Sequence, residues 1–283
     1  DELPPPAGNA PKAAARRGLR APAAIGLGNR EDARQTLQRA LQAARDNAEV
    51  HLALAQLALA DGDAGKAMQD LDQALLLDPA HHESLLLKGD LLRATGKSAE
   101  AVAVYREVVR IAPRHTGARL ALAGIAIADG KLAEARKEVG AVLTITPNNL
   151  QARYTEALID FREKKTESAR DHLAAVLKAA PEFMPALLLG GLVEYALGNL
   201  QPAETHLNKV VKTAPDNLYA RRLLAASQLR LGRPDDAAHT LAPALKSASQ
   251  DAGVLVVAGE IALAKKDFAQ ASAYFEQAAQ RNP

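Results

Sequence analysis

The sequence predicts an all-α fold, a right-handed α-solenoid or superhelix built from helical hairpins. The first observation is a proline that recurs every 34 residues, at positions 79, 113, 147, 181 and 215. The second is an alanine at position 20 of every 34-residue repeat counted from residue 48, and the third is a glycine at position 15 in five of these seven repeats. A fixed period of this length is typical of an array in which each hairpin buries its apolar side against the next.

The expected elements follow one another along the chain. Residues 1–13 hold four prolines and are predicted to form an extended linker. Residues 14–47 fit a degenerate repeat, whose first helix we expect to be shortened or broken because it contains Pro22. Seven regular repeats are predicted over residues 48–283, and they begin at residues 48, 82, 116, 150, 184, 218 and 252.

Small residues mark the places in each repeat where two helices approach closely. Position 20 is always alanine and position 8 is always alanine or glycine. A larger side chain at such a contact would overpack it at a cost of about 1–3 kcal/mol. Position 15 is predicted to end the first helix in a left-handed conformation, although Lys164 and Lys266 replace glycine in two repeats. Proline at position 32 is predicted to end the second helix, because it disfavours helical geometry in the preceding residue.

The composition argues against several classes of partner and chemistry. With 35 Lys and Arg against 33 Asp and Glu, the net charge of +2 predicts no binding to nucleic acid or to an anionic membrane. The chain has no cysteine, which excludes disulfides and thiol chemistry. No apolar run approaches the roughly 18–20 residues of a transmembrane helix. Because the chain begins at Asp1 without a signal peptide, we interpret it as a mature or excised fragment.

The pattern resembles that of the tetratricopeptide repeat (TPR) family across residues 48–283, and more weakly from residue 14. The resemblance rests on small residues at positions 8 and 20, a large apolar residue at 24, alanine or valine at 27 and proline at 32. It implies a non-enzymatic scaffold whose first helices line a concave surface that binds a partner protein or peptide. The expected groove-lining positions of the first helix are 2, 5, 9 and 12.

Two stretches carry a closer resemblance: residues 185–245, which begin PALLLGGLVEYALGNLQPAETHLNKVV, and residues 258–283, AGEIALAKKDFAQASAYFEQAAQRNP. They are similar to the long TPR lipoproteins of bacterial exosortase (PEP-CTERM) and exopolysaccharide systems. This resemblance implies a periplasmic protein, lipid-anchored outside these residues and with further repeats after Pro283, that serves exopolysaccharide assembly or export or surface sorting. The alternatives are a cytoplasmic TPR adaptor and the TPR arm of a larger enzyme of glycosyltransferase or sulfotransferase type.

Aromatic residues gather at the groove-lining positions of three consecutive repeats, which hold four of the nine aromatics in the chain. Such a cluster favours a site that grips an extended or helical peptide by apolar anchors. A nearby arginine would set the polarity of the ligand by pairing with a carboxylate. The alternative is that these aromatics only pack neighbouring helices. The predicted groove residues are Tyr154, Leu158, Phe161, Leu188, Leu192, Tyr195, Tyr219 and Arg222.

Other chemical motifs are incomplete. The lysine and asparagine of a TPR carboxylate clamp are replaced, for example by Leu52 and Gln56. The stretch Gly96-Lys97-Ser98 lacks the earlier glycine of a phosphate-binding loop. The seven histidines show no metal-binding spacing, and we expect them to lie exposed in turns and on outer helices. We therefore predict no catalytic residues, no metal and no cofactor, and we expect self-association through the apolar face of residues 252–283.

Overall fold

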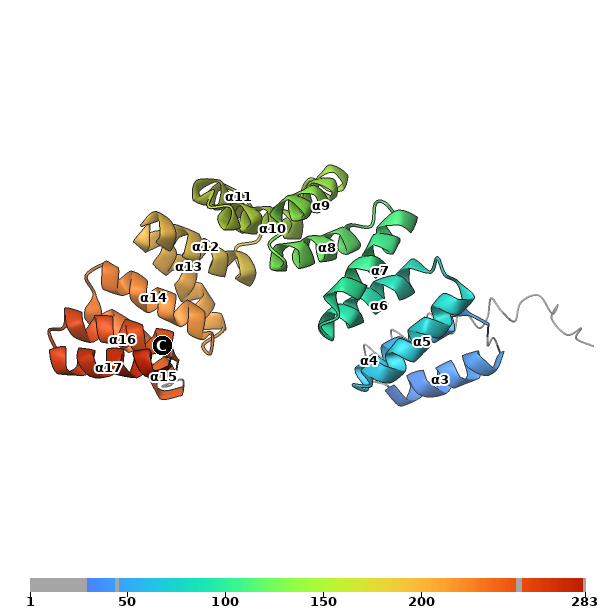
Figure 1. Ribbon diagram of the computed structural model, residues 1–283, viewed down its shortest axis with the longest axis horizontal. Helices are drawn as coiled ribbons and strands as arrows, with labels where there is room; N and C mark the ends of the chain where they lie inside the picture. The colour runs from blue at the N-terminus through green and yellow to red at the C-terminus, as the bar shows by residue number, and fades with distance from the viewer. Residues whose placement is uncertain (1–29, 44–45, 248–250, 282–283) are drawn as a thin grey trace, which may run out of the picture. The chain divides into compact units, whose positions relative to one another are not determined.

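The computed structural model describes residues 30–43, 46–247 and 251–281, which form fifteen α-helices and no strand (Figure 1). The all-α prediction is therefore confirmed. Helix α3 spans Arg30–Ala43 and precedes the regular repeats. The first helices of these repeats are α4 (Ala48–Ala60), α6 (His82–Ala94), α8 (Thr116–Ala128), α10 (Leu150–Arg162), α12 (Met184–Leu197), α14 (Leu218–Arg230) and α16 (Ala252–Ala264). The second helices are α5 (Ala64–Leu77), α7 (Ser98–Ile111), α9 (Leu132–Ile145), α11 (Thr166–Ala179), α13 (Leu200–Thr213), α15 (Pro234–Ser247) and α17 (Phe268–Arg281).

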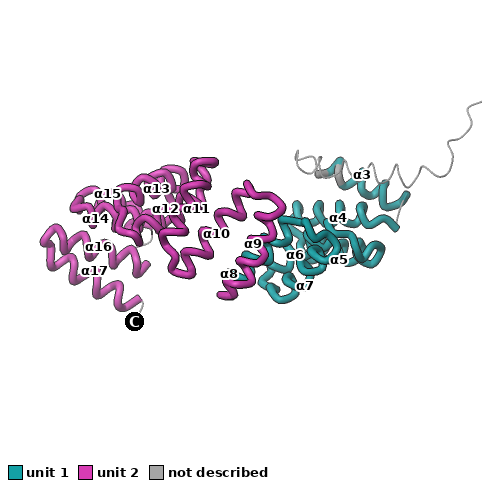
Figure 2. Tube along the Cα trace, turned by 90° about the horizontal axis from the view of Figure 1, so that it is seen from above, with its two compact units in different colours: residues 1–129 teal, residues 130–283 magenta. Residues whose placement is uncertain are grey.

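The helices belong to two compact units, residues 1–129 and residues 130–283 (Figure 2). In unit 1, α4 packs against α5 and α6 packs against α7. In unit 2, the same hairpin pairing joins α10 with α11, α12 with α13, α14 with α15, and α16 with α17. Each unit is thus a stack of helical hairpins, as expected for a solenoid. The linker expected at residues 1–13 and the helix expected around Pro22 lie outside the described residues.

The turn between the two helices of a repeat has the predicted left-handed residue at position 15. The five glycines there have φ between +74° and +82°. Lys164 and Lys266 adopt the same conformation, with φ of 63° and 64°, although a β-carbon makes it unfavourable. The prediction of a left-handed turn residue is therefore confirmed even where glycine is absent.

The second helices end where the repeat pattern predicts. All seven have their last helical residue at position 30. In five repeats that have a proline at position 32, the residue at position 31 is no longer helical, with φ between −123° and −139° and ψ between 78° and 94°. This conformation follows from the clash between the proline ring and the backbone before it.

The close approach of the helices explains the small residues. The alanines at position 20 are at most 3% exposed. A β-carbon added to Gly89 would lie 2.7 Å from the Tyr105 ring, and one added to Gly259 would lie 2.6 Å from the Phe275 ring. Position 8 is therefore glycine in both repeats whose large residue at position 24 is aromatic.

Each first helix begins after position 34 of the preceding repeat, where a side chain usually caps the helix. Asn47 Oδ1 accepts a hydrogen bond from Glu49 N at 2.9 Å, and Asp251 Oδ1 accepts one from Val254 N at 2.8 Å. Asn149 and Asn217 cap α10 and α14 in the same way. The polar residues at position 34 therefore help to fix the start of each repeat.

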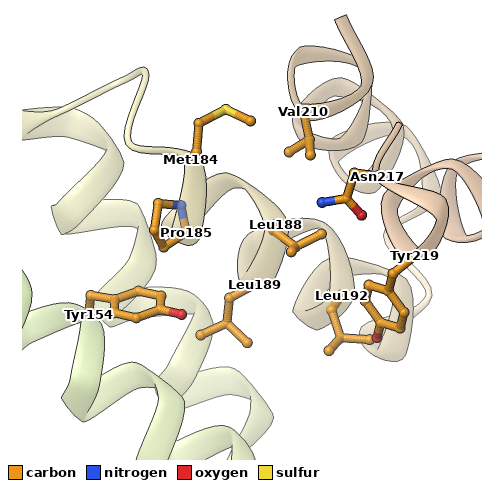
Figure 3. A pocket seen from close by; sticks show the side chains of 9 residues that line it. All are labelled: Tyr154, Met184, Pro185, Leu188, Leu189, Leu192, Val210, Asn217 and Tyr219. Atoms are coloured by element: carbon orange, nitrogen blue, oxygen red, sulfur yellow. The ribbon is translucent and has the colours of Figure 1, made fainter. Parts of the chain in front are cut away.

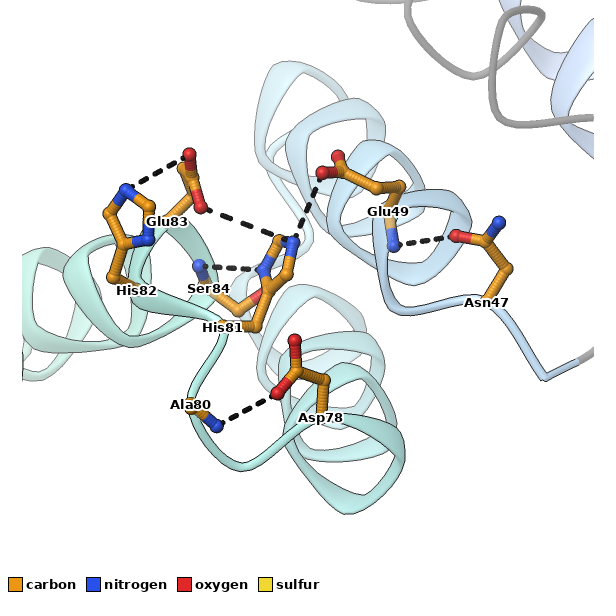
Figure 4. Close-up of polar contacts among 8 residues, drawn as sticks. All are labelled: Asn47, Glu49, Asp78, Ala80, His81, His82, Glu83 and Ser84. Carbon is orange, nitrogen blue, oxygen red and sulfur yellow. Dashed lines mark hydrogen bonds and ion pairs between the residues drawn. The ribbon is translucent and has the colours of Figure 1, made fainter. Parts of the chain in front are cut away.

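The expectation that the histidines are exposed was wrong for six of the seven: only His239 is exposed, five are half-buried, and the most buried is His81. It occupies the capping position before α6, is 9% exposed, and contacts Ser84 Oγ at 2.8 Å and Glu49 Oε1 at 3.2 Å (Figure 4). His115 caps α8, accepting a hydrogen bond from Ala118 N. His206 is half-buried on α13, and burial lowers its pKa. Capping and packing, rather than solvent exposure, account for these three residues.

Candidate functional site

The first helices of unit 2 form the layer that carries the candidate site. Helices α10, α12, α14 and α16 each contact the next one in addition to their hairpin partners. Side chains at positions 2, 5 and 9 of neighbouring first helices can therefore converge on one surface.

An apolar groove of about 430 Å³ lies where α10, α12, the end of α13 and the start of α14 meet (Figure 3). It is lined by Tyr154, Met184, Pro185, Leu188, Leu189, Leu192, Val210, Asn217 and Tyr219. None of these nine side chains carries a formal charge at neutral pH. The groove therefore suits an uncharged, largely apolar ligand.

Four of the eight predicted residues line this groove: Tyr154, Leu188, Leu192 and Tyr219. Tyr154 comes from α10, the two leucines come from α12, and Tyr219 comes from the first turn of α14. Figure 3 shows the Tyr154 hydroxyl directed past Leu189, and Tyr219 beside Leu192. The structure thus brings together side chains that are as many as 65 residues apart in the sequence.

The other four predicted residues lie elsewhere in unit 2. Leu158 and Phe161 pack, half-buried, against the core between α10, α11 and α12. The Tyr195 ring lies beneath the Arg230 guanidinium, whose central carbon is 4.8 Å from the ring centroid. Arg222 Nη1 is 3.3 Å from Asp251 Oδ1, so an acidic group of the chain itself already faces this arginine.

The two groove tyrosines differ in how firmly the fold holds them. The Tyr154 ring packs edge-on against Phe183, with the ring centroids 5.6 Å apart, and burial raises the pKa of its phenol. Tyr219 is 43% exposed and is the large hydrophobic residue that the groove presents most openly. Tyr154 therefore contributes to stability as well as to the groove, whereas Tyr219 is free to bury surface against a ligand.

Asn217 supplies an amide to the groove and was not among the residues predicted from the sequence. Its Oδ1 accepts a hydrogen bond from Ala220 N at 3.0 Å, which caps α14. Figure 3 shows its amide nitrogen directed toward the groove. Polar residues recur at position 34 of other repeats, and this recurrence was the sequence signal that could have pointed to Asn217. Met184, Leu189 and Val210 were missed because they lie at repeat positions 1, 6 and 27, which were not expected to line the groove. Pro185 lies at the expected position 2 and was not singled out.

Metal-binding clusters and membrane-spanning helices have no counterpart in the described part of the chain. No group of three or more His, Asp or Glu side chains there is arranged to hold a metal ion. None of the described helices combines the length and the apolar character needed to cross a membrane.

Family profiles for the tetratricopeptide repeat match almost the whole array. One matches residues 19–82, 52–116 and 154–217, a second matches 92–159 and 194–255, and a third matches 252–283. The chain therefore belongs to the tetratricopeptide repeat family. All the matching profiles describe this repeat, and none indicates a catalytic family. No curated protein matches the chain.

Solved structures of TPR proteins resemble the fold. A TPR protein from Parabacteroides merdae ATCC 43184 is 19% identical with a TM-score of 0.63, over 83% of this chain and 93% of that one. Pseudomonas aeruginosa pilF is 20% identical with a TM-score of 0.67, over 77% and 98%. YrrB, described as a TPR protein with an unusual peptide-binding site, is 18% identical with a TM-score of 0.52, over 65% and 95%. At these identities the likeness shows a shared fold.

Proposed function

We propose that this protein is a non-enzymatic scaffold that holds an apolar segment of a partner protein or peptide in the groove between α10, α12 and α14. The observation that carries the proposal is the convergence of Tyr154, Leu188, Leu192 and Tyr219 on one uncharged groove. Apolar and aromatic side chains in a pre-formed groove provide the anchors of peptide recognition.

The polar groups at one end of the groove suggest how a peptide is oriented. The Asn217 amide nitrogen is placed to donate a hydrogen bond to a peptide carbonyl. Arg222 lies near the Tyr219 ring, 6.0 Å from its centroid, and about a third of its side chain is exposed. It can therefore also meet a ligand carboxylate at this end, in competition with Asp251.

The groove is tested with Tyr219→Ala combined with Leu188→Ala. The native protein is cross-linked to its partners in cells, the partner segment is identified, and its affinity is measured as a synthetic peptide by fluorescence anisotropy. We expect at least a tenfold loss of affinity, because truncating two anchor side chains typically costs more than 1 kcal/mol each.

Leu76→Ala is the matched control, because Leu76 lies on α5 outside the groove and is 74% exposed. It should leave the affinity unchanged. Circular dichroism must show that the double variant keeps its helix content. An unchanged affinity in a folded double variant would contradict the proposal.

For the cellular setting, we propose the bacterial periplasm, with a role in exopolysaccharide assembly or export or in PEP-CTERM surface sorting. The proposal rests on the resemblance to lipoproteins of those systems that we infer from the sequence of residues 185–245 and 258–283. Fractionation of the native cells should place the protein with the envelope, and labelling with a palmitate analogue should report a lipid anchor. Recovery in the cytosol would favour a cytoplasmic adaptor instead, and a catalytic domain in the same polypeptide would favour the arm of a larger enzyme.

We also propose that two copies of this 283-residue chain associate through the exposed face of α17. Phe268 is 66% exposed and Phe275 is 37% exposed, whereas position 24 is at most 2% exposed in the six preceding repeats. These rings form an apolar surface on one helix, a feature that marks interaction sites.

A further inference from the structure

One location recurs at each repeat interface of unit 2, where position 21 of one repeat meets position 11 of the next. Three of these interfaces hold polar residues there: Arg136 with Asp160, Arg170 with Glu194, and Glu204 with Gln228. Arg136 Nη2 donates to Asp160 Oδ1 at 2.7 Å, and Gln228 Nε2 donates to Glu204 Oε1 at 3.2 Å. These two hydrogen bonds join the second helix of one repeat to the first helix of the next.

The next interface breaks this pattern because it holds Ala238 and Ala262. Among the six such pairs between regular repeats, this is the one with alanine at both positions. The residue at position 23 changes as well. At this position, His172 Nδ1 lies 3.0 Å from Asp160 Oδ2, and Thr240 Oγ1 donates a hydrogen bond to Gln228 Oε1 at 2.8 Å. Each of them thus contacts the polar pair of its own interface. At the interface with Ala238 and Ala262, the residue at position 23 is Tyr274.

The missing side chains leave a cavity of about 150 Å³ between α15, α16 and α17. Its apolar lining includes Leu241, Leu245 and Ile261 as well as the two alanines, and Tyr274 and Gln270 lie on its α17 side. None of these residues lines the groove at α12. The cavity is therefore a separate feature.

The two charged side chains at the cavity are engaged in different ways. Lys265 Nζ lies 2.7 Å from Asp235 Oδ1, and Asp267 Oδ1 accepts a hydrogen bond from Gln270 N at 3.1 Å. The one cation at the cavity therefore already has a counterion, Asp267 is engaged in capping α17, and a charged ligand would lose its own hydration on entering. The size of the cavity points the same way, because an apolar cavity of about 150 Å³ accepts benzene.

We infer that this cavity binds a neutral phenyl ring, presented as a phenylalanine side chain by a segment of a partner protein. Tyr274 can contact the ring edge-to-face, an arrangement that aromatic pairs favour. The exposed Gln270 side chain offers an amide beside the cavity, which suits the peptide groups on either side of a phenylalanine. The inference does not rest on the groove, because it concerns other helices and other side chains.

The cavity is tested by NMR on the full 283-residue chain with labelled isoleucine methyl groups. N-acetyl-phenylalanine amide and benzene are titrated in turn. We expect both to shift the Ile261 signal in a saturable way and to leave Ile159, which is buried away from this cavity, unchanged. N-acetyl-alanine amide should have no effect. Shifts with benzene alone would overturn the assignment to a protein side chain.

The deciding variant is Ala238→Arg with Ala262→Asp, which transplants the polar pair found at residues 136 and 160. It should weaken the binding of both ring compounds at least tenfold. Ala238→Leu fills the same space without a charge and gives a second test if the transplanted pair unfolds these repeats. Tyr219→Ala, which changes only the groove, should bind the rings as the wild type does. Unchanged ring binding in a folded, filled variant would overturn the inference.

Discussion

Single residues in the turns show where the sequence departs from its own repeat and what this costs. Lys164 and Lys266 are held at φ of 63° and 64°, in the region that five glycines occupy in the other repeats. A left-handed conformation costs a residue with a β-carbon roughly 1–2 kcal/mol, whereas glycine adopts it freely. The surrounding hairpin therefore imposes this conformation on the two lysines.

We predict that Lys266→Gly stabilises the hairpin of α16 and α17. The gain should be about 0.5–1 kcal/mol, because the relief of strain exceeds the larger chain entropy that glycine has in the unfolded state. Hydrogen exchange of the α16 and α17 amides measures the effect locally. Lys266→Ala is the control, since it removes the charge but keeps the β-carbon. If the alanine variant stabilised the hairpin as much as the glycine variant, charge rather than backbone strain would be the cause.

At the scale of elements, the helices, their left-handed turns and their proline stops could be predicted because each depends on a local backbone constraint. A glycine at position 15 adopts the left-handed conformation that ends a helix, and a proline disfavours helical geometry in the residue before it. The packing of the hairpin overrides this preference where Pro243 lies inside α15. The capping role of His81 was not predicted. Histidine is not a typical capping residue, and only the asparagines and aspartate at the same position in other repeats pointed to a cap.

The candidate groove was predictable in part. Repeat position was enough to place Tyr154, Leu188, Leu192 and Tyr219 on one surface. It did not place Tyr195, whose ring is covered by Arg230 from the next first helix. Whether a side chain at position 12 faces the groove thus depends on which side chain of the neighbouring repeat lies over it. The cavity at Ala238 and Ala262 could not be read from a single repeat for the same reason, because it arises from two small residues on different repeats.

For the whole molecule, the α17 face indicates how two copies can associate. One stripe of α17 carries four residues that are spaced by four, three and four positions: Phe268, Ser272, Phe275 and Ala279. Large and small side chains therefore alternate along this stripe. In α11, α13 and α15, position 28 is a larger residue, Leu or Val, that packs toward the next first helix. The α17 stripe differs from these helices because its residue at position 28, Ala279, is small. Its most exposed large residue is instead Phe268, near the start of the helix.

An antiparallel second copy would complement this stripe, with Phe268 facing the Ala279 of the other chain and Phe275 facing its Ser272. We predict that the double variant Phe268→Cys with Ala279→Cys forms disulfide-linked dimers on mild oxidation, as resolved by non-reducing electrophoresis. The chain has no cysteine of its own, so every disulfide involves the introduced residues. Gln270→Cys with Gln277→Cys is the matched control, because it would have the same antiparallel register but lies on another side of α17. Light scattering should show that Phe268→Ala lowers the dimer fraction, because the contact loses its most exposed ring. The cysteine variant also lacks this ring and reports the contact because oxidation traps it covalently. Equal cross-linking of the two cysteine pairs, or a wild-type chain that stays monomeric at high concentration, would rule out this mode of association.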